Sequence, residues 1–295
     1  MDIASYYLKQ SFITDPGKYV NMFADLPHDI AGLCRVVQGL VIHYRGGELF
    51  DYTVPEERLA EIDTRYVSRM LARICELDSR SLTEARPPEK RLVGCCRDFS
   101  TLFCAMARHQ GIPTRTRIGF ASYFNPNFNC DHEIVECWDT REQRWRLVDP
   151  EMSELHIKEN KIRFDVLNVP RDQFLVGGMV WQLYRSGRAD PDKFGVDPDS
   201  DLKGAWFIRH KLVQDLAALN RAELLLWDCW GLMLEEAPND EDLALLDKVA
   251  ALTQAGNDAF PELQQIYEHG RGLKVTPVVM NFSPAAEPGE VTLIF

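Results

Sequence analysis

The sequence has no long apolar run and no concentration of positive charge. Its 295 residues include 33 Lys and Arg against 45 Asp and Glu, so the formal net charge is −12. A membrane helix needs about 20 consecutive apolar residues, and a nucleic-acid or anionic-lipid surface needs a cluster of Lys and Arg. The chain offers neither, so we expect no membrane partner and no nucleic-acid partner.

The marks of a secreted protein are also missing. Residues 1–5 contain no basic stretch leading into an apolar run, so no signal peptide is expected. The cysteines are too sparse for a small disulfide-stapled scaffold, which is shorter and denser in cysteine. They are Cys34, Cys75, Cys95, Cys96, Cys104, Cys130, Cys137 and Cys229. We expect a cytoplasmic protein with reduced thiols.

Metal-binding patterns are weak. Cys130, His132 and Cys137 lie close together, but they lack paired C-x-x-C spacing and no second pair completes a tetrahedron. No acidic loop of the calcium-binding kind is present. We expect neither a metal nor a cofactor.

Three regions can be told apart along the chain. Residues 1–90 have mainly helical patterns, residues 91–170 mix helix and strand, and residues 171–295 return to helices and end in strands. The chain is long enough for a catalytic core with flanking modules. We therefore expect an α+β fold in which helical N-terminal and C-terminal regions pack around a core at 91–170.

Periodicity and end signals predict the individual elements. Helices are expected from Asp29 to about Gly46, from Glu56 to Leu77, from Cys96 to Gln110, within 204–234, and at 240–255 and 260–269. Strands are expected at 114–120, 133–138, 145–148, 273–282 and 291–295, with a loop at 123–129 and a linker at 190–199. The aromatic residues Trp206, Phe207, Trp227 and Trp230 are expected to pack in the core.

A cysteine stands at the start of the best-signalled helix. The segment Gly94-Cys95-Cys96-Arg97-Asp98-Phe99-Ser100 leads into apolar residues at helical spacing, and Gly111 followed by Pro113 ends the helix. A helix N-terminus lowers a thiol pKa, because its free N–H groups and its dipole favour the thiolate. The same N–H groups can donate to a developing oxyanion. Cys96 is therefore a candidate nucleophile.

His132 and Asp149 are candidate partners of that thiol. A histidine in reach would take and return a proton, and a carboxylate would hold the histidine in the right tautomer. If the two strands that follow the histidine pair antiparallel with Trp138 opposite Trp145, His132 lies diagonally beside Asp149. The hairpin register therefore predicts a hydrogen bond between them.

Together these residues resemble the transglutaminase-like superfamily, the papain-type fold of transglutaminases and related bacterial cysteine hydrolases. The resemblance covers about residues 91–151. It rests on four motifs in the family's order: Gly94-Cys95-Cys96-Arg97-Asp98-Phe99-Ser100, Gly111-Ile112-Pro113-Thr114-Arg115, Asp131-His132-Glu133-Ile134-Val135-Glu136 and Trp145-Arg146-Leu147-Val148-Asp149-Pro150.

The resemblance implies a cysteine-proteinase-like core in which Cys96 is the nucleophile, His132 the base and Asp149 the orienting carboxylate. It favours Cys96 over Cys95, because the family's cysteine stands second after the glycine. One feature departs from the family: a small residue and an aromatic often follow its histidine, where this chain has Glu133-Ile134.

Structural roles compete with the chemical ones. Four cysteines are expected to be packing residues, namely Cys34, Cys75, Cys104 and Cys229. Cys96 and His132 could themselves be core residues, and Asp149 before Pro150 could simply start a turn. Asp98 is expected to brace the first helical turn, and Arg115 to anchor the core by hydrogen bonds.

The predicted activity is thiol-dependent acyl transfer through a thioester on Cys96, most readily hydrolysis of an amide in a peptide, a protein or a small molecule. Transfer of the acyl group to an amine stays open, because the outcome depends on how the cleft excludes water and binds a second substrate. A binding scaffold that has the fold without the chemistry is the alternative from another class. The oligomeric state is open.

Overall fold

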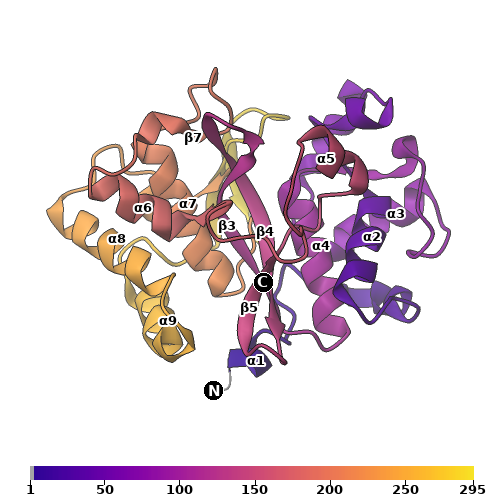
Figure 1. Ribbon diagram of the computed structural model, residues 1–295, viewed down its shortest axis with the longest axis horizontal. Coiled ribbons are helices and arrows are strands. Elements are labelled where there is room, and N and C mark those ends of the chain that lie inside the picture. The colour runs from indigo at the N-terminus through magenta and orange to yellow at the C-terminus, as the bar shows by residue number, and fades with distance from the viewer. Residues whose placement is uncertain (1–2) are drawn as a thin grey trace. The chain divides into compact units, whose positions relative to one another are not determined.

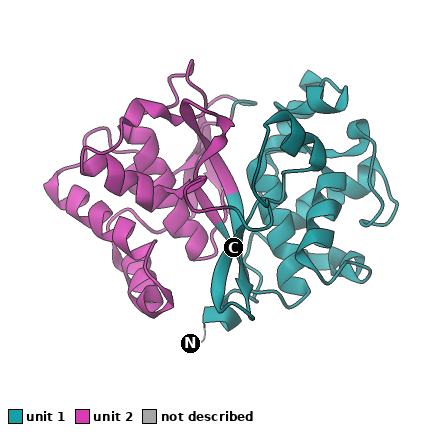
Figure 2. Ribbon diagram, in the orientation of Figure 1, with its two compact units in different colours: residues 1–116, 134–169, 284–286 teal, residues 117–133, 170–283, 287–295 magenta. Residues whose placement is uncertain are grey.

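The computed structural model describes residues 3–295, which form two compact units (Figure 2). Among these residues, unit 1 comprises 3–116, 134–169 and 284–286, and unit 2 comprises 117–133, 170–283 and 287–295. The division passes through two long strands, so each of these strands gives residues to both units. The three-region division expected from the sequence follows other boundaries and stays a prediction.

Unit 1 is mainly helical (Figure 1). Its helices are α1 (Ile3–Tyr6), η1 (Gly17–Phe23), α2 (Ile30–Leu40), η2 (Gly47–Phe50), η3 (Glu56–Asp63), α3 (Val67–Leu77), η4 (Pro88–Lys90), α4 (Cys96–His109) and α5 (Glu154–Glu159). Helices α2, α3 and α4 bury their apolar faces in a common core that includes Leu33, Met70 and Phe103. Because α4 is buried along its length, this core fixes the helix that begins at Cys96.

Two expected helices of unit 1 have other boundaries. The cap at Asp29 is confirmed, since its side chain accepts a hydrogen bond from the backbone N–H of Gly32. The helix ends at Leu40, however, because the next residues form β1 (Val41–His43), which pairs in parallel with β2 (Leu92–Gly94). The helix expected from Glu56 to Leu77 is interrupted at residues 64–66, between η3 and α3.

A five-stranded sheet has the order β5-β4-β3-β6, with β7 beside β4. Its strands are β3 (Thr114–Asn125), β4 (Phe128–Asp139), β5 (Arg144–Val148), β6 (Phe174–Val176) and β7 (Phe194–Gly195). The antiparallel pairing of β4 with β5 is confirmed, with Trp138 opposite Trp145 and Val135 opposite Val148.

The prediction of a loop at 123–129 is wrong. Strands β3 and β4 continue to Asn125 and from Phe128, so only Pro126 and Asn127 turn. The side chain of Asn125 closes this turn by accepting from the backbone N–H of Asn127 at 3.0 Å. The aromatic residues flanking the turn favour strands, and of the Asn and Pro residues that suggested a loop only Pro126 and Asn127 lie outside the two strands.

Unit 2 combines helices with a small antiparallel sheet. Its helices are η5 (Pro191–Lys193), α6 (Gly177–Arg185), α7 (Ala205–Leu219), η6 (Gly231–Met233), α8 (Asp240–Leu252), η7 (Asn257–Ala259) and α9 (Phe260–His269). Its second sheet has the order β10-β9-β8, from β8 (Asp228–Cys229), β9 (Val278–Asn281) and β10 (Gly289–Thr292). Helix α6 packs on α7 and α8, and a Cβ at Gly177 would lie 2.7 Å from the carbonyl oxygen of Lys211. Only glycine permits that approach.

The outcome for the C-terminal expectations is mixed. The helices at 240–255 and 260–269 are confirmed. The apolar run at 204–234 is α-helical only to Leu219, after which the chain turns toward β8 and the short helix η6. The stretch at 190–199 lies inside unit 2 and contains β7, which pairs with β4, so it is not a linker. Trp230 and Phe207 are buried as expected, whereas Trp206 is 40% exposed. Among residues 3–295, no helix has the length and apolar content needed to cross a membrane.

Candidate active site

Cys96 is the first residue of α4. The preceding residue, Cys95, is extended at the N-cap, and the Cys96 side chain is 5% exposed. Asp98 braces this turn as expected, because its Oδ2 accepts from the backbone N–H of Cys95 at 2.7 Å. The thiol therefore stands where helix N–H groups and the dipole stabilise negative charge.

The side chain of Arg97 also stabilises the first turn of α4. Its guanidinium is fully buried and donates to Asp98 Oδ1 at 3.1 Å and to the carbonyl oxygens of Arg65 at 2.6 Å and Thr64 at 3.3 Å. Those two carbonyls belong to the break between η3 and α3. The start of α4 is thus tied to a segment more than 30 residues earlier in the chain, and its first turn is held rigidly.

The side chain of Asp98 requires a glycine at position 94. A Cβ at this position would lie 2.7 Å from Asp98 Oδ2 and 2.8 Å from Asp98 Cβ. Any larger residue would therefore displace the carboxylate that caps the helix. The glycine of the motif leaves room for Asp98 rather than for an unusual backbone angle.

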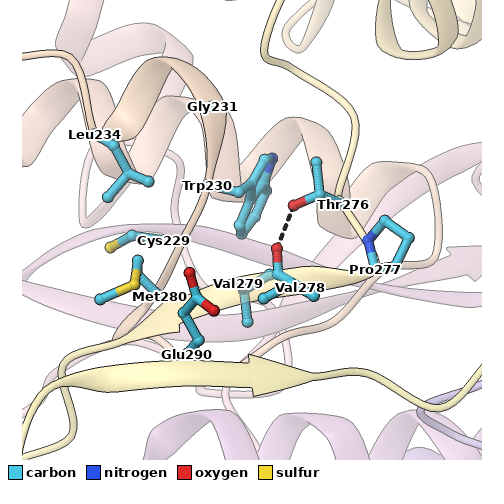
Figure 3. A pocket seen from close by; sticks show the side chains of 10 residues that line it. All are labelled: Cys229, Trp230, Gly231, Leu234, Thr276, Pro277, Val278, Val279, Met280 and Glu290. Carbon is cyan, nitrogen blue, oxygen red and sulfur yellow. Dashed lines mark hydrogen bonds between the residues drawn. The ribbon is translucent and has the colours of Figure 1, made fainter.

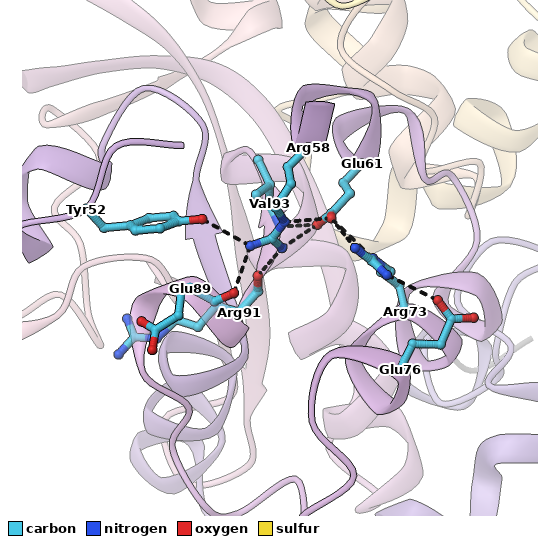
Figure 4. A network of polar contacts seen from close by, with 8 residues as sticks. All are labelled: Tyr52, Arg58, Glu61, Arg73, Glu76, Glu89, Arg91 and Val93. Atoms are coloured by element: carbon cyan, nitrogen blue, oxygen red, sulfur yellow. Dashed lines mark hydrogen bonds and ion pairs between the residues drawn. The ribbon is translucent and has the colours of Figure 1, made fainter. Parts of the chain in front are cut away.

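Glu61 anchors the strand that leads to the cysteines (Figure 4). Its carboxylate accepts from Arg58 Nη2 at 2.7 Å, from Arg73 Nη2 at 2.9 Å and from the backbone N–H of Val93 at 2.9 Å. Arg58 also donates to the carbonyl of Arg91 at 2.7 Å. No local pattern predicts this role, because the contact of Glu61 with Val93 spans 32 residues.

Three other thiols of unit 1 are poorly suited to attack. Burial raises the pKa of Cys34 well above its usual range and that of Cys137 to about 12. A hydrogen bond with Cys96 lowers the pKa of Cys95, but burial and the Asp98 carboxylate together raise it above its ordinary value. These thiols stay protonated at neutral pH. None of the eight cysteines, which all lie within residues 3–295, forms a disulfide.

Asp149 directly follows β5 and is 1% exposed. Its backbone N–H donates to the carbonyl of Val166 at 2.9 Å, and its Oδ1 accepts from the backbone N–H of Glu151 at 3.1 Å. One carboxylate oxygen therefore closes a turn, which is the structural role that the sequence left open. The backbone bond fixes where the carboxylate lies.

His132 belongs to the part of β4 that lies in unit 2, whereas Cys96 and Asp149 belong to unit 1. It is 3% exposed and packs in an aromatic box. Its ring centroid lies 5.0 Å from that of Phe124, 6.1 Å from Tyr123 and 6.4 Å from Phe174, with the planes steeply inclined. These rings fix the orientation of the imidazole.

Arg115 anchors the core, as expected. Its Nη2 lies 2.7 Å from Glu136 Oε2, and its guanidinium carbon is 4.1 Å from the ring centroid of Trp145. Both partners are in unit 1. Within residues 3–295, no three His, Cys, Asp or Glu side chains are arranged to hold a metal ion.

Residues 76–150 match the family model of the transglutaminase-like superfamily. The chain contains a transglutaminase-like core. The matched residues include Cys96, His132 and Asp149, and the α+β class expected from the sequence is confirmed. The transglutaminase-like core takes up about a quarter of the chain. No curated protein matches the chain.

Two solved structures resemble this chain. A candidate cysteine protease from Cytophaga hutchinsonii is 16% identical, with a TM-score of 0.34, over 60% of this chain and 46% of that one. Red sea bream transglutaminase is also 16% identical, with a TM-score of 0.32, over 95% of this chain and 42% of that one. This chain therefore covers less than half the length of either structure.

Proposed function

We propose that the protein is a cysteine hydrolase that cleaves an amide bond through a thioester on Cys96. The observation that supports this most strongly is the position of Cys96 at the N-terminus of α4 within a transglutaminase-like core. There the thiol has helix N–H groups beside it, and Arg97 and Asp98 keep the turn from moving.

His132 would serve as the general base, and Asp149 would orient it. Val135, three residues after His132 on β4, pairs with Val148, which directly precedes Asp149. This register supports a hydrogen bond between the two side chains, because diagonal neighbours on paired strands can reach one another. The aromatic box would hold the imidazole in one orientation.

In the proposed reaction the Cys96 thiolate attacks the amide carbonyl and His132 protonates the leaving amine. The resulting thioester is then hydrolysed by water that gives a proton to His132. The positive end of the α4 dipole would stabilise the oxyanion in both steps. The acceptor is water, because that step needs no second binding site.

Thiol reactivity tests the nucleophile and the base. Iodoacetamide labelling between pH 5 and 9, mapped by mass spectrometry, should find Cys96 alkylated fastest below pH 7. That advantage should disappear in His132→Ala and in His132→Phe, which retains an aromatic ring in the aromatic box. Exposed His269 supplies a matched control, His269→Ala, that should label like the wild type. If Cys96 labels no faster than the other cysteines, the protein is a scaffold without the chemistry.

A substrate screen tests the reaction itself. A library of glutamine, asparagine and peptide amides should release an amine in the wild type and in Cys104→Ser, whose buried thiol lies on the same helix. Cys96→Ser should release none. Adding an excess of a primary amine should leave the acid as the main product. If the amine is incorporated instead, the enzyme is a transferase rather than a hydrolase.

A further inference from the structure

Cys229, in unit 2, lines an open cavity (Figure 3). The cavity has a volume of about 480 Å³ and is lined by residues of β8, β9, β10 and η6. Cys229 is directly opposite Met280 across β8 and β9, and Met280 is directly opposite Glu290 across β9 and β10. Directly opposed residues share a face of the sheet. A thiol, a thioether and a carboxylate therefore form a row along one wall.

His210 on α7 completes the group from the side. Its Nδ1 lies 3.7 Å from Cys229 Sγ, and its Nε2 lies 2.6 Å from the carbonyl oxygen of Met233. A carbonyl only accepts hydrogen bonds, so Nε2 carries the proton and Nδ1 presents a lone pair toward the thiol. Trp206 packs edge-on against the imidazole with centroids 5.0 Å apart, which holds the ring in this orientation.

We propose that Cys229 Sγ, His210 Nδ1 and Met280 Sδ form a site for a single Cu(I) ion. The sulfur and nitrogen already stand at a chelating separation. With a metal–sulfur bond of about 2.3 Å and a metal–nitrogen bond of about 2.0 Å, an angle of 110–120° puts the two ligand atoms about 3.5–3.7 Å apart. Cys229 and Met280 line the cavity, so the metal would enter from there.

The donor set selects the metal. A thiolate, a thioether and an imidazole are soft or intermediate ligands, which suit Cu(I), whereas Zn²⁺ prefers a tetrahedron of thiolate, imidazole and carboxylate donors. Among residues 3–295, no third His, Cys, Asp or Glu stands close enough to complete such a tetrahedron. Exposed Glu290 is not a ligand, but its negative charge at the cavity wall favours an approaching cation.

Metal binding at this site balances without a redox step. A thiol binds a metal as its thiolate, so formation of the copper–sulfur bond releases the thiol proton to solvent, and copper remains Cu(I) throughout.

Anaerobic titration tests the site in the full-length protein. Cu(I), supplied as its acetonitrile complex, would compete with a chromophoric Cu(I) chelator for the protein. We expect one tight site per chain. Cys229→Ser should abolish it, and Met280→Leu and His210→Phe should each weaken it by about 100-fold. X-ray absorption of the loaded protein should find two sulfur ligands and one nitrogen ligand.

A pair of sulfur-containing side chains in unit 1 provides the control. Cys75 Sγ lies 3.5 Å from Met22 Sδ, without a histidine. Cys75→Ser and Cys96→Ser should therefore keep the site intact. Loss of binding in either of these variants rather than in Cys229→Ser would overturn the proposal, and so would Zn²⁺ that binds the same residues more tightly than Cu(I). Since Cys96→Ser removes the proposed activity and spares copper binding, the two proposals fail separately.

Discussion

Removing the carboxylate of Asp98 should lower the stability of the helix turn that positions Cys96. Asp98→Ala deletes the acceptor for the backbone N–H of Cys95 and a carboxylate that forms an ion pair with Arg97, in a turn that is almost fully buried. Breaking a buried ion pair by removing one partner costs about 3–5 kcal/mol. Arg97 keeps two carbonyl acceptors, so we expect a loss near the lower end, about 3 kcal/mol.

A double variant separates the effect of the unpaired Arg97 charge from the effect of losing the hydrogen bond between Asp98 and the backbone of Cys95. Burial raises the pKa of Asp98, and Arg97 offsets this only in part, so the ionised pair is itself expensive to bury. In Arg97→Met/Asp98→Ala no unpaired guanidinium remains. That protein should be about 1–2 kcal/mol more stable than Asp98→Ala alone.

Urea unfolding, followed by tryptophan fluorescence and far-UV circular dichroism, measures these differences. The tryptophans of unit 1 are Trp138 and Trp145, so the fluorescence change can be assigned to that unit by replacing them. If Asp98→Ala costs less than about 1 kcal/mol, or if the double variant is less stable than the single one, the uncompensated charge is not what destabilises the turn.

Three further predictions concern other positions. Burial raises the pKa of Glu61, but hydrogen bonds from two arginines and a backbone N–H outweigh this and lower it below 4.5. Its stabilisation is therefore present above pH 4.5 and lost as the pH falls through the folded pKa. Glu61→Gln should be less stable at pH 7 and lose less on acidification to pH 3; an equal loss in thermal melts would contradict this. Gly94→Ala should cost about 1–3 kcal/mol by displacing Asp98 and slow thiol labelling, whereas unchanged labelling would count against the bracing role. In the wild type, Arg117 Nη2 lies 2.9 Å from Asp215 Oδ2, and both side chains are buried in unit 2. Asp215→Ala leaves the guanidinium without its ion-pair partner, so it should lower the stability by about 3–5 kcal/mol. Limited proteolysis at the wild-type rate would contradict this.

Local signals were sufficient for the elements that carry the candidate residues. Helix α4 begins at Cys96 and stops before Gly111, as its apolar spacing and its glycine predict. The register of β4 with β5 follows from a short polar turn and from alternation along two strands, and Trp138 lies opposite Trp145 as predicted. Each of these depends on residues that are neighbours in the sequence.

Long-range pairing explains the failures. Val41 and Ile42 continue an apolar pattern that suits a helix, but they pair with β2, about 50 residues later. Such pairing overrides a helical propensity that is weak for β-branched residues. Glu61 escaped notice for the same reason, because its partner at Val93 cannot be inferred from spacing.

The interruption at residues 64–66 shows how the motif shapes structure beyond its own helix. A continuous helix through these positions would engage the carbonyls of Thr64 and Arg65 in its own hydrogen bonds. Arg97 needs those carbonyls, since it is fully buried and Asp98 alone cannot satisfy its donors. The break therefore exchanges helical hydrogen bonds for charge-assisted ones. Arg97 belongs to the motif that predicts catalysis, but its role here is structural: it holds the start of α4 against the end of η3.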